Sequence, residues 1–147
     1  MVTPDATLVR TIPAMQDTKN LIVSDHARHL AVAVYRLTAE FPSEERFGLA
    51  QQMRRAAVSI GSNIAEGCGR RGNRELLNYL YIAFASSSEL EFQLQLAGEL
   101  EFGAVSNREK TFAQLRSVRR MLNRLTAYLR AQPARRRKEV PPNGKGP

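Results

Sequence analysis

Apolar residues between positions 76 and 97 recur in alternating steps of four and three, and this feature most limits what the chain can fold into. The period is that of a helix with one face buried against other helices, and it continues for three heptads. Leu77, Tyr81 and Phe84 widen the apolar arc, so we expect this helix to contact more than one neighbour. The repeating positions are Leu76, Leu80, Ala83, Ser87, Leu90, Leu94 and Ala97.

Three other segments have the same helical period, and no strand-like alternation competes with them. Short connections between consecutive helices favour antiparallel neighbours. The sequence therefore predicts an all-α fold, an antiparallel up-and-down four-helix bundle over residues 24–131. The apolar stripes are Ala27, Leu30, Ala31, Val34, Leu37 and Phe41 in the first helix, Met53, Ala57, Ile60 and Ile64 in the second, and Phe112, Leu115, Val118, Leu122, Leu125 and Leu129 in the fourth.

Capping and breaking residues predict where the helices begin and end. Residues able to cap a helix precede each apolar stripe, and Ser106 with Glu109 forms a capping-box pattern. Two glycines are expected to end the second helix by entering the left-handed region. The expected starts are Ser24, Ser43, Asn73 and Ser106, and the expected ends are Pro42, Gly67 with Gly69, Gly98 with Gly103, and Pro133.

The two ends of the chain lack a sustained apolar period. Residues 1–23 contain Pro4 and Pro13 among scattered polar residues, which predicts a flexible arm. Residues 132–147 are polar and rich in Pro and Gly, which predicts a disordered basic tail. The chain also has no run of about 18 apolar residues and no secretory pattern, so we expect a cytoplasmic protein with no membrane partner.

Positive charge is concentrated at the C-terminal side of the chain. Residues 1–104 hold 10 basic and 12 acidic side chains, a net charge of -2, whereas residues 105–147 hold 12 basic and 2 acidic side chains, a net charge of +10. The overall charge of +8 therefore arises from the last helix and the tail. Such a block favours a polyanion such as RNA or DNA as a partner, and it is also compatible with a solvated face.

The basic residues that we expect to contact phosphates form three groups. GCGRRG at residues 67–72 has the composition of a phosphate-binding loop, but it follows a helix and lacks the strand-loop-helix context, so it is predicted to be a turn. Its arginines still precede a helix N-terminus, where free N–H groups favour anions. The three groups are Arg70, Arg71 and Arg74, then Arg116, Arg119, Arg120, Arg124 and Arg130, and finally Arg135, Arg136, Arg137 and Lys138.

A polar stripe shares the second helix with its apolar stripe. Two interpretations stay open: a hydrogen-bonded network, with an Arg-Glu pair, that fixes helix register or a subunit contact, and a nucleic-acid surface. The first is favoured because buried polar groups must be paired, and an Arg-Glu pair can provide that pairing. The residues of this predicted structural or oligomer set are Arg55, Ser59, Asn63 and Glu66.

Residues 41–97 resemble the four-helix-bundle proteins encoded in intervening sequences of bacterial 23S ribosomal RNA genes. This chain has Gly61 where proline often stands in that family. The residues that carry the resemblance are Arg54, Ser59, Asn63, Glu66, Gly67 and Arg70.

The resemblance implies an antiparallel bundle that assembles as a ring-like homopentamer. It also relates the chain distantly to the accessory variability proteins of diversity-generating retroelements. Those relatives use a basic surface to bind nucleic acid and a reverse transcriptase. The resemblance thus implies RNA or DNA as a partner, and a nucleic-acid enzyme such as a reverse transcriptase as a candidate protein partner.

Catalytic and metal-binding patterns are weak in this sequence. His26 and His29 lie three residues apart, but two ligands do not make a site, and Cys68 is the single cysteine. The helical serines have no sequence cue for a general base. We therefore expect a non-enzymatic protein without metal or cofactor. The alternative to nucleic-acid binding is an adaptor for an acidic protein partner.

Overall fold

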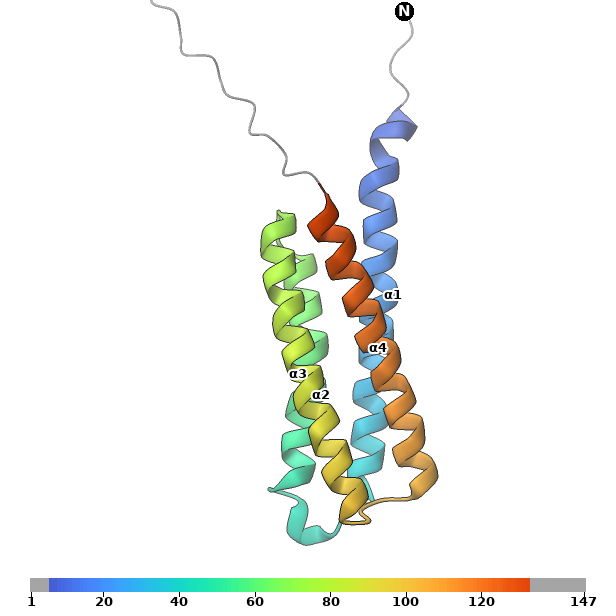
Figure 1. The fold of residues 1–147 in the computed structure, drawn as a ribbon, viewed down its shortest axis with the longest axis vertical. Coiled ribbons are helices and arrows are strands. Elements are labelled where there is room, and N and C mark those ends of the chain that lie inside the picture. Colours follow the sequence, from blue (N-terminus) through green and yellow to red (C-terminus); the bar gives the residue numbers. More distant parts are fainter. Residues whose placement is uncertain (1–5, 133–147) are drawn as a thin grey trace, which may run out of the picture.

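The chain folds as an antiparallel bundle of four α-helices (Figure 1). The computed structural model describes residues 6–132, with side chains described for Asn20 and for residues 22–132. Each helix packs against two neighbours, in the cyclic order α1, α2, α3, α4. The predicted all-α four-helix bundle is confirmed. The helices are α1 (Ala6–Ala39), α2 (Leu49–Cys68), α3 (Asn73–Glu99) and α4 (Val105–Ala131), with a short 3-10 turn at Ser43–Glu45 between α1 and α2.

The predicted apolar stripes form the core. All seven repeating positions of α3 are buried, and so are the four of α2. Burying a Leu or Ile side chain stabilises a fold by about 1.5–3 kcal/mol relative to leaving it in water, so these layers dominate the stability. Ser87 fits this apolar layer because its hydroxyl donates to the Phe84 carbonyl at 2.6 Å.

Helix α1 begins well before the expected start at Ser24. The structure places residues 6–23 in α1, so the prediction of a flexible arm over residues 1–23 is wrong for that part. Asn20 and Val23 are both buried, and they continue the stripe of Ala27 by steps of three and four. The apolar pattern of the sequence does not indicate this continuation, because a polar residue, Asn20, occupies one of the buried positions.

The other helix starts also differ from the expected caps. Ser43–Glu45 form the 3-10 turn, and the Glu45 carboxylate accepts the Leu49 N–H at 3.0 Å, so it caps α2 from outside. Gly72 is the N-cap of α3, which begins at Asn73. Helix α4 starts at Val105, one residue before the predicted capping box of Ser106 and Glu109, and its N-cap Ala104 offers no side-chain hydrogen bond.

The predicted left-handed glycines at the end of α2 are not left-handed. Gly69 has a φ of -77°, and Gly67 is buried inside the helix. A Cβ at Gly67 would lie 2.8 Å from the Cβ of Tyr79, so this glycine lets α2 and α3 approach closely. Among the described residues the positive φ angles are those of Glu101 (57°) and Gly103 (74°), both in the connection from α3 to α4.

Candidate nucleic-acid interface

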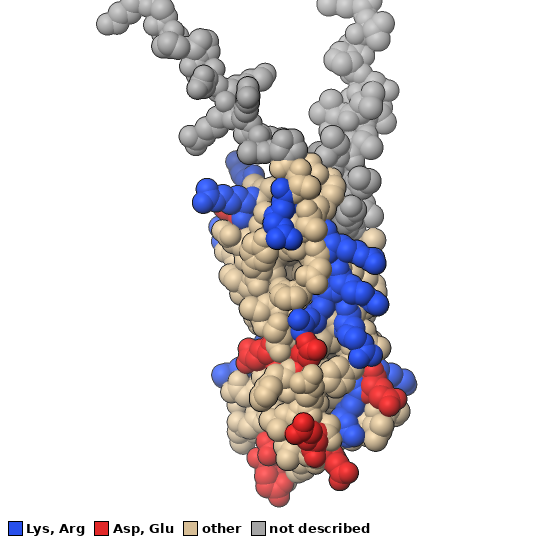
Figure 2. Space-filling model, viewed as in Figure 1, with Lys and Arg blue, Asp and Glu red and all other residues tan. Residues whose placement is uncertain are grey.

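The up-and-down order of the helices gathers several predicted binding residues at one end of the molecule. Helix α2 ends, α3 begins and α4 ends at this same end, which is the upper end of Figure 1. Figure 2 shows Lys and Arg side chains at that end and along the side formed by α4. We call this the basic end, and it comprises Arg70, Arg71, Arg74 and Arg130.

A row of arginines continues from the basic end along α4. Arg116, Arg120 and Arg124 are exposed and follow one another at spacings of four residues, or about 6 Å of helix rise per step. They point to solvent because the opposite face of α4 is buried through Leu115, Val118 and the residues that follow that stripe. The Arg116 guanidinium lies 6.0 Å from the Phe112 ring centroid, which is a weak cation–π contact. We call these three residues the α4 row.

Arg119 is already neutralised, so it is the weakest of the predicted phosphate contacts on α4. Its Nη1 donates to the Glu91 carboxylate of α3, and its guanidinium lies 4.7 Å from the Phe84 ring centroid. The side chain is only 23% exposed. Arg119 therefore ties α4 to α3 rather than facing solvent.

Arg70 is also partly neutralised. Its Nη2 donates to the Glu66 carboxylate at 2.6 Å and to the Tyr79 hydroxyl at 3.1 Å. The hydrogen bond with Glu66 raises the pKa of Arg70 above its ordinary value, and Tyr79 adds to the effect. This exposed group links the end of α2 to α3.

Six of the predicted arginines remain exposed and, among the described residues, form no ion pair with a carboxylate. Their guanidinium groups are free to take up phosphate oxygens in a bidentate fashion. Tail residues Arg135, Arg136, Arg137 and Lys138 lie outside the described residues. The six exposed arginines are Arg71, Arg74, Arg116, Arg120, Arg124 and Arg130.

Carboxylates are concentrated at the opposite end of the bundle, which Figure 2 shows at the bottom. There α1 ends, α3 ends and α4 begins. The separation gives the molecule an axial charge asymmetry that favours approach of a polyanion from the basic end. We call this the acidic end, and it comprises Glu40, Glu44, Glu99, Glu101 and Glu109.

The polar stripe of α2 makes a partial network between α2 and α3. The hydroxyls of Ser59 and Ser86 lie 2.9 Å apart, and Asn63 Nδ2 donates to the Ser59 carbonyl at 2.8 Å and to its hydroxyl at 3.1 Å. Glu66 pairs with Arg70 and not with Arg55, which lies 11 residues away, or about 16 Å along the helix. The expected Arg55-Glu66 pair does not form within the chain.

Arg54 was not among the predicted site residues, although it belongs to the motif behind the family resemblance. It is half-buried between α1 and α2 and donates to the Thr38 hydroxyl at 2.8 Å. No sequence pattern indicates this contact, because it depends on how α1 and α2 align.

Other classes of site have little support in the described part of the chain. Within residues 6–132, no group of three or more described His, Cys, Asp or Glu side chains is placed to hold a metal ion. Within the same range, none of the helices combines the length and apolar character needed to span a membrane.

Comparison with known proteins identifies the family. The family model of the 23S rRNA-intervening sequence protein matches residues 19–124, so the chain belongs to this family. A solved structure from Bacteroides thetaiotaomicron, a protein of unknown function from the S23 ribosomal protein family, is similar with a TM-score of 0.68. It is 24% identical and the match covers 74% of this chain and 98% of that one, which supports the fold. The search of curated proteins gave no significant match.

Proposed function

We propose that this member of the family is a non-enzymatic, cytoplasmic scaffold that assembles as a homo-oligomer, a pentamer, and binds RNA or DNA. The basic end and the α4 row contact the phosphates. The observation that carries the proposal is the set of six exposed arginines, unpaired with carboxylates in the described structure, on one end and one side of the bundle. The acidic end lies away from the nucleic acid in this arrangement.

Binding of this kind is independent of base sequence. Phosphate contacts position a protein on a nucleic acid but carry no direct sequence information. The α4 row lies on the surface of a helix whose apolar face is buried in the bundle. A ring of identical subunits repeats the same basic surface around one axis, so several copies engage one strand at high effective concentration.

The second candidate function is an adaptor for an acidic protein, because the same six arginines bind carboxylates as well as phosphates. A nucleic-acid enzyme such as a reverse transcriptase fits either function as a partner. Competition separates the two functions. Under the nucleic-acid proposal, duplex DNA displaces an acidic protein at low salt, whereas an adaptor retains its acidic partner in the presence of excess DNA.

The test is fluorescence anisotropy with a hairpin RNA and a duplex DNA at several salt concentrations. Six phosphate contacts predict a loss of affinity of about three orders of magnitude between roughly 50 and 200 mM salt. Replacing Arg71, Arg74 and Arg130 by Gln removes three contacts and should flatten the salt dependence by about half.

A matched control removes the same charge from another part of the surface. Arg36→Gln, Arg46→Gln and Lys110→Gln change three exposed residues near the acidic end. Equal losses of affinity in the two triple variants would show that net charge, and not the basic end, governs binding. Light scattering measures the oligomer, and a monodisperse monomer at tens of micromolar would remove the pentamer from the proposal.

A further inference from the structure

The two histidines of the chain, His26 and His29, lie close together on α1. His26 is half-buried and His29 is exposed. Among the described residues, neither imidazole takes part in a hydrogen bond or an ion pair. The apolar core uses neither side chain, and neither belongs to the basic end or to the α4 row. Both imidazoles are therefore available for a ligand.

The helical period places both histidines on the side of α1 that faces α4. Near the basic end, Ile22 lines a small crevice between the two helices together with Arg124 of α4. Near the acidic end, the Glu40 carboxylate accepts a hydrogen bond from Asn107 of α4 at 2.8 Å. The positions between these two contacts follow one another in steps of four and three, which is one stripe of a helix. The stripe consists of Ile22, His26, His29, Ala33, Arg36 and Glu40.

The histidines lie beside the α4 row. Helices α1 and α4 run in opposite directions (Figure 1), so counting from the two contacts puts the histidines level with residues 118–121 of α4. Arg120 and Arg124 are exposed on the adjoining turns. A long side chain on a helix leans towards the helix N-terminus, which brings Arg124 closer to this level. Because packed helices lie about 8–10 Å apart, one strand of nucleic acid can contact both helices here.

The charged groups around the histidines are mainly cationic. The nearest carboxylate on α1 is that of Asp25, which pairs with Arg28 at 3.1 Å. Helix α4 carries no carboxylate after Glu109. Protonating an imidazole here adds a cation beside Arg120 and Arg124, and a bound phosphate offsets that repulsion. The described charged residues that border the histidines are Asp25, Arg28 and Arg36 on α1, and Arg120 and Arg124 on α4.

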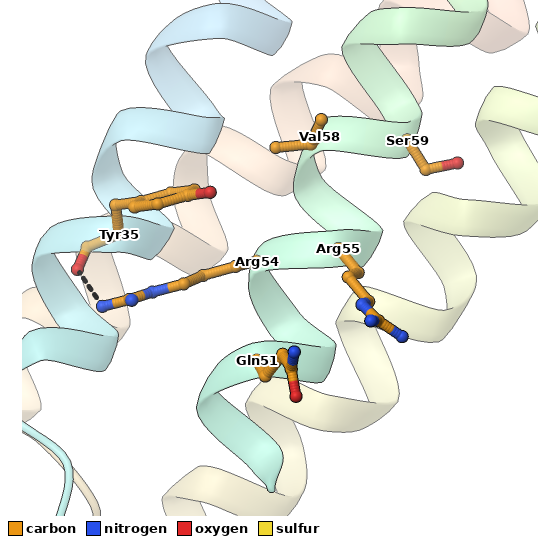
Figure 3. Close-up of a pocket in the computed structure, with 6 residues that line it drawn as sticks. All are labelled: Tyr35, Gln51, Arg54, Arg55, Val58 and Ser59. Carbon is orange, nitrogen blue, oxygen red and sulfur yellow. Dashed lines mark hydrogen bonds between the residues drawn. The ribbon is translucent and has the colours of Figure 1, made fainter. Parts of the chain in front are cut away.

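The side of α1 that faces α2 offers no comparable surface. Figure 3 shows the Arg54 side chain extending towards α1 and the Arg55 side chain extending the other way, so the two guanidinium groups do not converge on one anion. Arg54 is also engaged within the bundle. Its Nε donates to the Thr38 hydroxyl at 2.8 Å, and its guanidinium lies 4.7 Å from the Tyr35 ring centroid. Only on the α4 side does a charge gained by α1 join a row of accessible arginines.

We propose that His26 and His29 are a proton-dependent part of the nucleic-acid surface. In their protonated form they contact phosphates of the strand that lies along the α4 row. An imidazole changes its charge between about pH 5 and 8. A bound phosphate favours the protonated imidazole, and by linkage the protonated imidazole favours the phosphate. The affinity for nucleic acid therefore rises as the pH falls. This inference rests on the proposed function and extends its site onto α1.

The test is fluorescence anisotropy of a labelled hairpin RNA with the full chain at about pH 6 and about pH 8, over a range of salt concentrations. At about 100 mM salt, binding should be about tenfold tighter at the lower pH. The slope of log affinity against log salt should also be steeper there by about 1.5, because two added phosphate contacts contribute about 0.7–0.9 each.

Two double variants assign the effect to the histidines. His26→Gln with His29→Gln should bring the affinities at the two pH values within about twofold of each other. His26→Lys with His29→Lys fixes the positive charge, so this variant at about pH 8 should bind about as tightly as the unchanged protein at about pH 6. Gln and Lys are good helix formers, and circular dichroism checks that both variants are folded.

A matched control moves the same titrating pair to another helix. Ser62→His with Ala65→His, added to the double Gln variant, places two histidines three residues apart at exposed positions of α2. Helix α2 lies diagonally across the bundle from α4. The pH dependence should not return, and its full return would overturn the assignment to α1.

Two further results would overturn the proposal. One is equal affinity of the unchanged protein at the two pH values, and the other is full pH dependence in the double Gln variant. In both cases, salt-dependent binding at about pH 8 would still support the proposed function. Absence of binding at both pH values would contradict the proposed function and this inference together.

Discussion

The two ends of the bundle use their charged residues in different ways. At the acidic end, Arg108 Nη1 donates to the carbonyl of Phe102 at 2.9 Å and to that of Gly103, and the Phe102 ring packs 5.4 Å from that of Phe41. At the basic end, the connection from α2 to α3 has exposed arginines, and a Cβ added at Gly72 would meet no atom within 4 Å. The loop at the acidic end is held by specific contacts, whereas Arg71 and Arg74 at the basic end are exposed and form no described ion pair.

A guanidinium group that is hydrogen-bonded within the protein is not available to bind a phosphate at the same time. Arg108 satisfies backbone carbonyls that would otherwise lack partners, so it contributes to stability. Arg71 and Arg74 form no ion pair in the described structure, so they retain their capacity for phosphates. We therefore expect substitutions at the acidic end to change stability and substitutions at the basic end to change binding.

The largest expected effect on stability is at Gly103. Its φ of 74° is unfavourable for any residue with a Cβ, and a Cβ there would lie 2.6 Å from Leu37 Cδ1. Gly103→Ala should lower the free energy of unfolding by about 2–4 kcal/mol, since backbone strain and overpacking add. Urea denaturation followed by circular dichroism at fixed protein concentration measures it.

Gly72→Ala is the matched control at the basic end. Gly72 has an extended backbone with a φ of -155°, and the added methyl group has open space. Because Gly is preferred to Ala at an N-cap, the change should lower the free energy of unfolding by no more than about 1 kcal/mol. Equal destabilisation by the two glycine substitutions would remove the distinction between the ends.

A smaller effect is expected at Arg108. Arg108→Met keeps most of the aliphatic side chain but removes both hydrogen bonds to the loop carbonyls, which should lower the free energy of unfolding by about 1–2 kcal/mol. The same urea experiment measures the change. Arg71→Met at the basic end should change the free energy of unfolding by less than half as much. A larger loss of stability for Arg71→Met than for Arg108→Met would contradict the distinction between the two ends.

Glu101 offers a stabilising substitution at the acidic end. It occupies the left-handed position after α3, with the Phe102 N–H bonded to the Ala97 carbonyl at 2.9 Å, a position that usually favours glycine. Glu101→Gly should raise the free energy of unfolding by about 0.5–1 kcal/mol. Glu99→Gly, inside the last turn of the same helix, should lower it by a similar amount. Thermal and urea denaturation of both variants measure these changes. If both substitutions changed the free energy of unfolding in the same direction, the left-handed position of Glu101 would be misassigned.

The smallest effect on stability is expected from the triple variant of Arg71, Arg74 and Arg130. These exposed side chains form no described ion pair, so replacing them by Gln should leave the melting temperature within about 2 °C of the unchanged protein. A large loss of stability would show that the basic end is structural, and would make its effect on nucleic-acid binding uninterpretable.

The sequence predicts the core of this fold well because core positions follow a local period. Leu80, Leu90 and Ile64 were assigned to buried faces from spacing alone, and each is fully buried. Helix ends were predicted less well because they depend on contacts between segments. Glu45 caps α2 from the preceding turn, and Gly67 serves the packing of α3 rather than the end of α2.

The candidate site was predicted only in outline. Charge asymmetry along the sequence indicated α4, and the up-and-down order brings Arg130 to the same end as Arg71. The neutralisation of Arg119 could not be predicted, because Glu91 reaches it only through the alignment of α3 with α4. The hydrogen bond from Arg54 to Thr38 depends in the same way on α1 and α2.

The cyclic order of helix contacts also bears on how quickly the chain reaches this structure. Three of the four α-helix pairs in contact within the described residues join consecutive helices, and the fourth, α1 with α4, joins segments far apart in the sequence. Asn107 Nδ2, which donates to the Glu40 carboxylate across 67 positions, belongs to that distant pair. Chains whose contacts lie mostly between consecutive segments fold in about microseconds to milliseconds, since little loop entropy is lost before those contacts form. The docking of α4 on α1 is then the step in folding that closes the whole chain.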